Sequence, residues 1–198
     1  VGFATGGYTS NGLHKSLDSK IMPILSNSLV TRVLTKQELE ATNFLTTEVI
    51  TDTRTLRNYY RRLPDNRVQI GSRSSITGAD APNPRHMAVL VNGLHRKFPA
   101  LKGIQIDYSW WGWVDVSHDM MPRITQPDAK ANVFYALGYG GNGVSFSAHA
   151  GRRLAQRIAG KADRAFELPI YASPLEYPNV LNAVRSRAFA PFRRFGQR

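Results

Sequence analysis

The sequence predicts a mixed fold of helices and strands, in the α+β or mixed α/β class. The segment 104–111 places Ile, Ile, Tyr and Trp at every second position, which is the spacing of one face of a strand. TKQE, at Thr35 to Glu38, fits a capping box and therefore predicts the start of a helix. The apolar run 132–137 is followed by glycines and a helical pattern, which predicts a strand–turn–helix unit.

The first quarter of the chain is expected to be mostly extended. A short apolar strand at 1–4 precedes a Thr-Gly-Gly turn, and a second extended segment covers 21–34. After the helix that begins at Thr35, the stretch TTEVITD at 46–52 is typical of a short strand.

The middle of the chain is expected to hold a hairpin, a helix and a long strand. Two strand-like runs in 56–73 flank the turn residues PDN at 64–66, which predicts a hairpin. The segment 84–98 has apolar residues at helical spacing and stops at Pro99. Gly112 is expected to interrupt the long strand that begins at 104, as a bulge or a point of close backbone approach.

GYGGNG begins at Gly138 and precedes a helix that is expected to end at Gly160. One face of this helix is expected to carry the apolar residues Val144, Ala148, Leu154, Ala155 and Ile158. A helix N-terminus presents free N–H groups and a partial positive charge, and glycines let an electron-rich ligand come close. A tight turn that lets helix and strand pack explains the glycines as well, so the residues alone leave both interpretations open.

Composition excludes several classes of protein. The 198 residues are enough for one good core or two small ones, and no apolar run approaches the roughly 20 residues of a membrane span. Cysteine is absent, which excludes disulfides, thiolate metal sites and cysteine nucleophiles, and fits a reducing, cytoplasmic location. The five histidines form no HxxxH or HxH pair, so we expect no metal site. The sequence also lacks a GxGxxG motif after a strand, a GxSxG motif and a Walker loop.

The formal charge is +12, and part of it is concentrated at the end of the chain. No acidic residue follows Glu176, whereas five arginines do: Arg185, Arg187, Arg193, Arg194 and Arg198. Arginines mixed with aromatic residues can bind RNA or an anionic membrane surface, and a non-catalytic role with an anionic partner is the alternative function. We favour a solvated basic tail and expect no nucleic-acid partner.

Several blocks of sequence, taken in order, resemble one known family. They are ATGGYTS, YYRRLPDNRVQIGSR, FPALKGIQIDYSWWGWVDVSHDMMPRI and NVFYALGYGGNGVSFSAHAGRRLAQRIAG. Together they resemble the C-terminal half of the FAD-dependent oxidoreductases of the D-amino-acid oxidase (DAO) type. That family includes glycine and sarcosine oxidases and γ-glutamylputrescine oxidoreductases, and the last are closest in style. The resemblance extends to about Leu175.

The resemblance implies an antiparallel substrate-domain sheet, together with the last strand–glycine turn–helix elements of an FAD-binding Rossmann-like domain. Residues 1–12 would be a late strand of the FAD domain and 13–103 the substrate-domain sheet and helices. Residues 104–160 would return to the flavin, and 161–198 would form the basic tail. The N-terminal dinucleotide-binding segment, with its GxGxxG turn, is not among these residues. We therefore expect the chain alone to be inactive, to bind FAD weakly and to self-associate through exposed apolar surface.

The resemblance also implies the activity: oxidation of the C–N bond of a small amine or amino acid by hydride transfer to flavin. Three groups of residues would contact FAD, and they are Ala4, Thr5 and Gly6, then Gly112, and then Gly138, Tyr139, Gly140, Gly141, Asn142, Gly143 and Val144. Sarcosine oxidases carry a flavin-linked cysteine where Gly112 aligns, so FAD is expected to be non-covalent here. They also carry a carboxylate-binding lysine where this chain has Ser145.

Two aromatic residues are the candidates for the catalytic site. Tyr60, beside Tyr59, lies on a strand that by resemblance faces the substrate side of the flavin. Trp111 is expected to pack beside the flavin ring or to cap the pocket. Ordinary cross-strand packing for the tyrosines and a core position for the tryptophan remain the alternatives.

Overall fold

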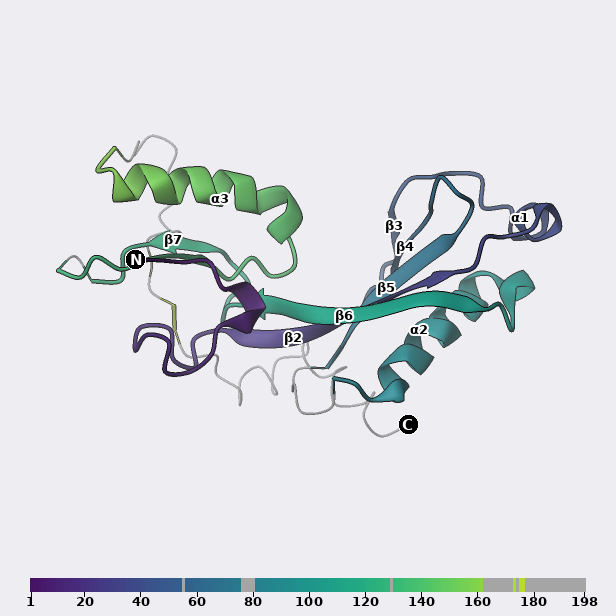
Figure 1. The fold of residues 1–198 in the computed structure, drawn as a ribbon, viewed down its shortest axis with the longest axis horizontal. Coiled ribbons are helices and arrows are strands. Elements are labelled where there is room, and N and C mark those ends of the chain that lie inside the picture. Colours follow the sequence, from purple (N-terminus) through teal and green to yellow (C-terminus); the bar gives the residue numbers. More distant parts are fainter. Residues whose placement is uncertain (55, 76–80, 129, 162–172, 174, 177–198) are drawn as a thin grey trace. The chain divides into compact units, whose positions relative to one another are not determined.

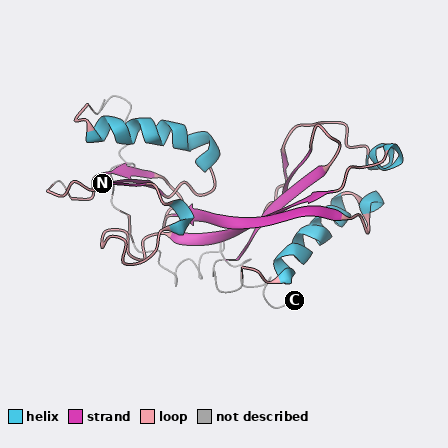
Figure 2. Cartoon of the chain, viewed as in Figure 1, coloured by secondary structure: helices cyan, strands magenta, loops and turns pink. Residues whose placement is uncertain are grey.

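The fold is a mixture of helices and strands, as predicted from the sequence (Figure 2). A computed structural model describes residues 1–54, 56–75, 81–128, 130–161, 173, 175 and 176. The chain divides into two compact units. The first contains Val1–Ile24 and the described residues of Trp113–Arg185, and the second contains the described residues of Leu25–Gly112. Most of the predicted basic tail at 161–198 lies outside the described residues.

The second unit is built on a five-stranded sheet. Its strands follow the order β3 (Ile50–Thr51), β4 (Tyr59–Arg62), β5 (Val68–Ser75), β2 (Met22–Thr31) and β6 (Ile106–Val116) (Figure 1). The β3–β4, β4–β5 and β5–β2 pairs are antiparallel. The β4–β5 pair is the hairpin predicted around PDN, where Asn66 takes the left-handed φ of 65° that asparagine tolerates.

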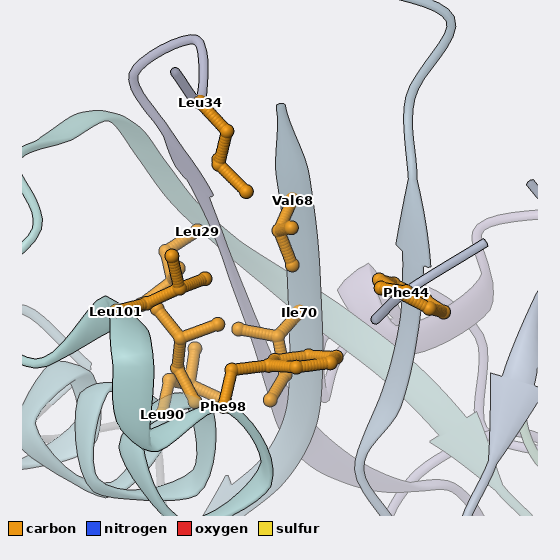
Figure 3. Close-up of a cluster of buried hydrophobic side chains, with 9 residues drawn as sticks. Leu29, Leu34, Phe44, Val68, Ile70, Leu90, Phe98 and Leu101 are labelled. Carbon is orange, nitrogen blue, oxygen red and sulfur yellow. The ribbon is translucent and has the colours of Figure 1, made fainter. Parts of the chain in front are cut away.

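One face of this sheet is covered by α2 (Pro84–Lys97) and the residues that follow it. Leu29 and Ile70 are Cα partners on β2 and β5, and both are fully buried. Figure 3 shows them beside Leu90 of α2 and beside Phe98 and Leu101, which follow the helix. The apolar residues at alternate strand positions and those at helical spacing in α2 therefore form one apolar core.

The ends of the helices in this unit follow from local sequence. Thr35 accepts a hydrogen bond from the Glu38 backbone N–H, and the Glu38 carboxylate accepts one from the Thr35 N–H, so α1 (Lys36–Thr42) begins with the predicted capping box. The Asn83 side chain caps α2, with Pro84 at its first position. Lys97 is the last residue of α2, two residues before Pro99.

The first unit contains a three-stranded sheet with the order β1 (Gly2–Phe3), β8 (Phe134–Leu137) and β7 (Arg123–Thr125). β8 is parallel to β1 and antiparallel to β7. All four β8 residues are buried, because Phe134 and Ala136 pack beneath α3 (Gly143–Ile158) while Tyr135 and Leu137 pack on Leu17 and its neighbours. Burial on both faces explains why the predicted strand is a continuous apolar run.

Three features differ from the expectations. β6 continues through Gly112 to Val116, so this glycine does not interrupt the strand. β7 was not predicted, since three residues are too few to establish a period.

The third difference concerns α3, whose sheet-facing residues are Phe146, Ala150 and Leu154. Of the apolar face expected from the sequence, Val144 and Ile158 are exposed, and only Leu154 is buried. The helix carries two apolar stripes. The stripe with a spacing of four residues is the one that packs on β7 and β8.

Candidate functional site

The parallel pairing of β1 with β8 brings two predicted cofactor-binding segments to one edge of the sheet. Gly2 is the Cα partner of Phe134, and Phe3 is the partner of Tyr135. Parallel strands end at the same edge. Ala4, Thr5 and Gly6 follow β1, and the glycine turn 138–143 follows β8, so both turns lie beyond the carboxyl ends of neighbouring strands. Open α/β sheets bind ligands at this kind of edge.

The glycine turn needs glycine partly for reasons within the chain. Gly138, Gly140 and Gly141 have φ values of 84°, 61° and 97°, which residues with a β-carbon rarely adopt. A β-carbon at Gly138 would also stand 3.1 Å from Ser117 Cβ, and one at Gly140 would stand 3.2 Å from the Met120 carbonyl oxygen. Tight packing therefore explains Gly138 and Gly140, while Gly141 and Asn142 are exposed.

The N-terminus of α3 lies beyond the turn. Asn142 occupies the N-cap position but makes no capping hydrogen bond through its side chain, and the Ser145 hydroxyl donates to the Asn142 carbonyl instead. The N–H groups of a first turn have no partners within the helix and carry the positive end of the helix dipole. Val144, in this turn, is fully exposed. These groups fit an electron-rich, flat ligand edge such as that of a flavin ring.

A buried carboxylate, missed by the sequence reasoning, holds the turn from beneath. The Gly138 N–H donates to Asp115 Oδ2 at 2.5 Å, and the Gly140 N–H donates to the Asp115 carbonyl oxygen at 2.9 Å. Asp115 lies near the end of β6 and is 6% exposed. An aspartate within a strand is uncommon, and this was the signal that could have identified it.

A second support is the turn 117–121, against which Gly138 and Gly140 pack. Arg123 holds this turn, because its guanidinium donates to both carboxylate oxygens of Asp119, at 3.2 and 2.7 Å, and to the Met121 carbonyl at 2.9 Å. Burial opposes ionisation of Asp119, but the hydrogen bonds from Arg123 and from the Met121 N–H outweigh it and lower the pKa of Asp119 to about 2. Asp119 therefore has a structural role in this turn.

The turn after β1 packs on Trp113. A β-carbon at Gly7 would stand 2.6 Å from Trp113 Cβ and 2.7 Å from its carbonyl carbon. The hydroxyls of Thr5 and Thr9 share a hydrogen bond of 2.7 Å around this turn. Gly6 has a φ of 55° and open space around its Cβ position. Contact with Trp113 therefore requires glycine at position 7, and the assignment of Gly6 to cofactor binding stays a prediction.

Tyr60, the first catalytic candidate, lies in the second unit with its ring against the apolar core. The ring stands 5.8 Å from Phe98 in an edge-to-face arrangement and 5.9 Å from Phe44. Lys97 Nζ lies 4.5 Å from the centre of the Tyr60 ring and is held there by Asp52. These contacts agree with the packing interpretation of Tyr60 and leave its catalytic role without support.

Tyr59 points to the opposite face of the sheet, since neighbouring residues of a strand alternate. Its hydroxyl shares a hydrogen bond of 2.7 Å with the Ser26 hydroxyl on β2. Arg73 is the Cα partner of Ser26, and burial lowers the pKa of its guanidinium, with the Tyr59 phenol opposing this shift and the charge of Arg57 adding to it. This face therefore presents hydroxyl groups and positive charge.

Trp111 and Gly112 lie on β6, which is one of the two edge strands of the five-stranded sheet. Trp111 is 44% exposed, so it is not a core residue of the second unit. The structure gathers the predicted cofactor residues 4–6 and 138–144 in the first unit, while Tyr60, Trp111 and Gly112 belong to the second.

Within the described ranges, no group of three His, Asp or Glu side chains is placed to hold a metal ion. None of the helices in the described part of the chain is both long and apolar enough to cross a membrane.

Turns and a helix N-terminus at the carboxyl edge of parallel strands are typical of α/β proteins that bind a nucleotide cofactor. The sequence model of the DAO family, described as FAD dependent oxidoreductase, matches residues 1–157. The chain belongs to this family, which implies FAD as the cofactor.

Curated relatives agree with this assignment. The chain is 32% identical over 174 residues to a gamma-glutamylputrescine oxidoreductase of Escherichia coli (strain K12), an alignment that covers 86% of this chain and 40% of the relative. It is 28% identical over 166 residues to a probable oxidoreductase OrdL of Haemophilus influenzae, covering 81% of this chain and 36% of the relative. The chain thus spans about two fifths of the length of these relatives.

Solved structures share the fold at low sequence identity. Glycine oxidase from Geobacillus kaustophilus superposes with a TM-score of 0.66 at 17% identity, covering 89% of this chain and 45% of that protein. A modified fructosyl peptide oxidase from Aspergillus nidulans gives a TM-score of 0.69 at 14% identity, covering 94% and 47%.

Proposed function

We propose that this chain is the C-terminal part of an FAD-dependent enzyme that oxidises the C–N bond of a small amine or amino acid. The observation that carries the proposal is the parallel pairing of β1 with β8, which places two glycine turns and the N-terminus of α3 at one edge. Family membership supplies the cofactor, and the names of two similar proteins, a gamma-glutamylputrescine oxidoreductase and a glycine oxidase, support the substrate class.

In this proposal the cofactor-binding residues are those of the first unit. The backbone of Gly141 to Val144 would lie against the flavin ring, with the N-terminus of α3 directed at it. When bound, FAD would supply the hydride acceptor for the carbon beside the amine nitrogen, and loss of that hydride leaves a C=N bond. The positive end of α3 would stabilise the negative charge that the ring gains.

The family resemblance assigns the strand of Tyr59 and Tyr60 to substrate binding, and within the second unit the Tyr59 hydroxyl lies on the sheet face away from the apolar core. The hydroxyls of Tyr59 and Ser26 offer hydrogen bonds there, and neither hydroxyl is committed to the apolar core. Orientation of a neutral amine beside the flavin is the main requirement for hydride transfer, so binding groups suffice without an acid–base pair. We therefore propose Tyr59, in place of Tyr60, as the substrate-facing tyrosine.

FAD is proposed to be held non-covalently, because the 198 residues contain no cysteine to form a thioether. Denaturing the full-length holoprotein and passing it through a size filter should release all of the flavin absorbance into the filtrate. Flavin that stays with the denatured chain would contradict this assignment.

The proposed function is tested by expressing the full-length protein and recording its flavin spectrum. Anaerobic addition of glycine, N-methylglycine, γ-glutamylputrescine or a simple primary amine should bleach the oxidised flavin bands with at least one of them. Tyr59→Phe should slow the bleaching, whereas Tyr108→Phe, an exposed tyrosine of β6, should leave it unchanged. A folded full-length protein that takes up no flavin would refute the proposal.

A further inference from the structure

We propose that Asp115 is a positioning residue: it holds the glycine turn in its cofactor-binding conformation, and its buried negative charge lowers the midpoint potential of the flavin bound there. This inference rests on the proposed function. It concerns a residue that lies outside the turn and that no sequence motif singled out.

The geometric part of the argument is that one residue ties down two of the turn's N–H groups. Asp115 accepts from the Gly138 N–H through its carboxylate and from the Gly140 N–H through its carbonyl oxygen. An isolated bridge between Val116 and Tyr139 continues this contact on the next residue. Two anchored amides on either side of Tyr139 restrain the backbone that leads to α3, so the turn is ordered before any ligand arrives.

The electrostatic part follows from burial. The Asp115 carboxylate is buried and shielded from water. At a buried position the electric field of a charge is screened less, and so reaches further, than at the surface. The Asp115 charge also acts on Tyr139. Burial, together with this charge, raises the pKa of the Tyr139 phenol to about 12. A second negative charge entering the same environment meets the same opposition.

Reduction adds negative charge to a flavin. The N-terminus of α3 favours this charge, and Asp115, beneath the turn, opposes it. The N-terminus of α3 therefore raises the midpoint potential of the flavin, and Asp115 lowers it. Asparagine at position 115 would keep an oxygen that accepts from the Gly138 N–H but would carry no charge, so the two roles of Asp115 are separable.

The test uses the full-length holoprotein and three variants, Asp115→Asn, Asp115→Ala and Asp128→Asn. Asp128 is an exposed aspartate of the same unit whose removal changes the net charge equally, so it is the matched control. The flavin midpoint potential is measured by reductive titration against a reference dye, and the FAD dissociation constant is measured by fluorescence.

D115N should raise the midpoint potential and leave FAD affinity within about threefold of wild type, and D128N should change neither. D115A should weaken FAD binding by about tenfold or more, because the Gly138 N–H loses its partner. A D115N potential equal to that of D128N would overturn the electrostatic role, and unchanged FAD affinity in D115A would overturn the positioning role.

A measurement on the wild-type protein covers the case in which a variant does not fold. Hydrogen exchange of the apoprotein should show protected amides at Gly138 and Gly140, because Asp115 holds both without FAD. Rapid exchange at both amides would contradict the positioning role. A wild-type protein that takes up no FAD would overturn this inference together with the proposed function, whereas a flavin-loaded protein with an unaltered D115N potential would overturn the electrostatic role alone.

Discussion

The ring of Tyr59 lies across Gly71 on the neighbouring strand. A β-carbon at Gly71 would clash with ring atoms Cε2 and Cζ of Tyr59, and it would stand 2.8 Å from the Ser28 hydroxyl oxygen. The absence of a side chain at Gly71 therefore lets the tyrosine reach over β5 to the Ser26 hydroxyl on β2. A glycine in a strand often marks such a close approach.

Gly71→Ala should consequently displace the Tyr59 ring and lower the free energy of unfolding by about 1–3 kcal/mol, the usual cost of overpacking. Urea unfolding measures the change. Gly151→Ala is the control, because its Cβ position on α3 is open and alanine favours a helix by up to about 1 kcal/mol. In a Tyr59→Ala background, Gly71→Ala should cost much less free energy of unfolding than it does in the wild type. Strict additivity of the two changes would argue against the contact.

Gly138→Ala tests the glycine turn. The φ of 84° and the approach of Ser117 Cβ both penalise alanine there. Gly12 has nearly the same φ, 85°, but nothing within 4 Å of its Cβ position, so Gly12→Ala carries the backbone strain alone, about 1–2 kcal/mol. We expect Gly138→Ala to be the more destabilising of the two in thermal unfolding and to weaken FAD binding to the full-length protein. Equal effects would mean that crowding by the 117–121 turn is unimportant.

Asp52 is expected to make the stability of the second unit depend on acid pH. Burial raises the pKa of Asp52, but hydrogen bonds from Lys97, Arg54 and the Asn58 N–H outweigh it and lower the pKa to about 2. A lowered acid pKa stabilises the fold above the unfolded value of roughly 4, and this contribution is lost as the pH falls from there towards 2.

Asp52→Asn should therefore lower the free energy of unfolding at pH 7 by about 1–3 kcal/mol. Its unfolding curve should converge with that of the wild type near pH 2. Glu48→Gln, at an exposed position of the same unit, serves as the control and should follow the wild-type pH profile. Parallel curves for wild type and Asp52→Asn across the acid range would show that Asp52 does not carry this dependence.

Arg123 is expected to be irreplaceable by lysine. Its buried guanidinium donates to Asp119, to the Met121 carbonyl and, at 3.1 Å, to the Ser173 carbonyl, and a single ammonium group cannot reproduce that planar set. Arg123→Lys should cost about 2 kcal/mol in urea unfolding, whereas Arg152→Lys, on the exposed side of α3, should be neutral. A neutral Arg123→Lys would remove the support that we assign to the 117–121 turn.

Features whose causes lie within a few neighbouring residues could be predicted from the sequence alone. The Thr35–Glu38 capping box, the PDN hairpin and the glycine turn before α3 depend on local hydrogen bonds and on allowed φ values, and all three are in the structure. The mixed fold class follows from the two periodicities in the same way. Family resemblance extended these local features to a cofactor and a class of reaction.

Which side of each element is buried, and which distant residues come into contact, depends on packing and is visible only in the three-dimensional fold. Tyr59 and Tyr60 are equivalent in sequence, but α2 covers one face of the sheet, so Tyr60 packs in the core while Tyr59 stays on the other face. The pairing of Asp115 with Gly138 spans 23 residues, and no local pattern encodes it. Contacts of that kind depend on where the sheet places its strands, and this is set by the sum of all packing rather than by any one segment.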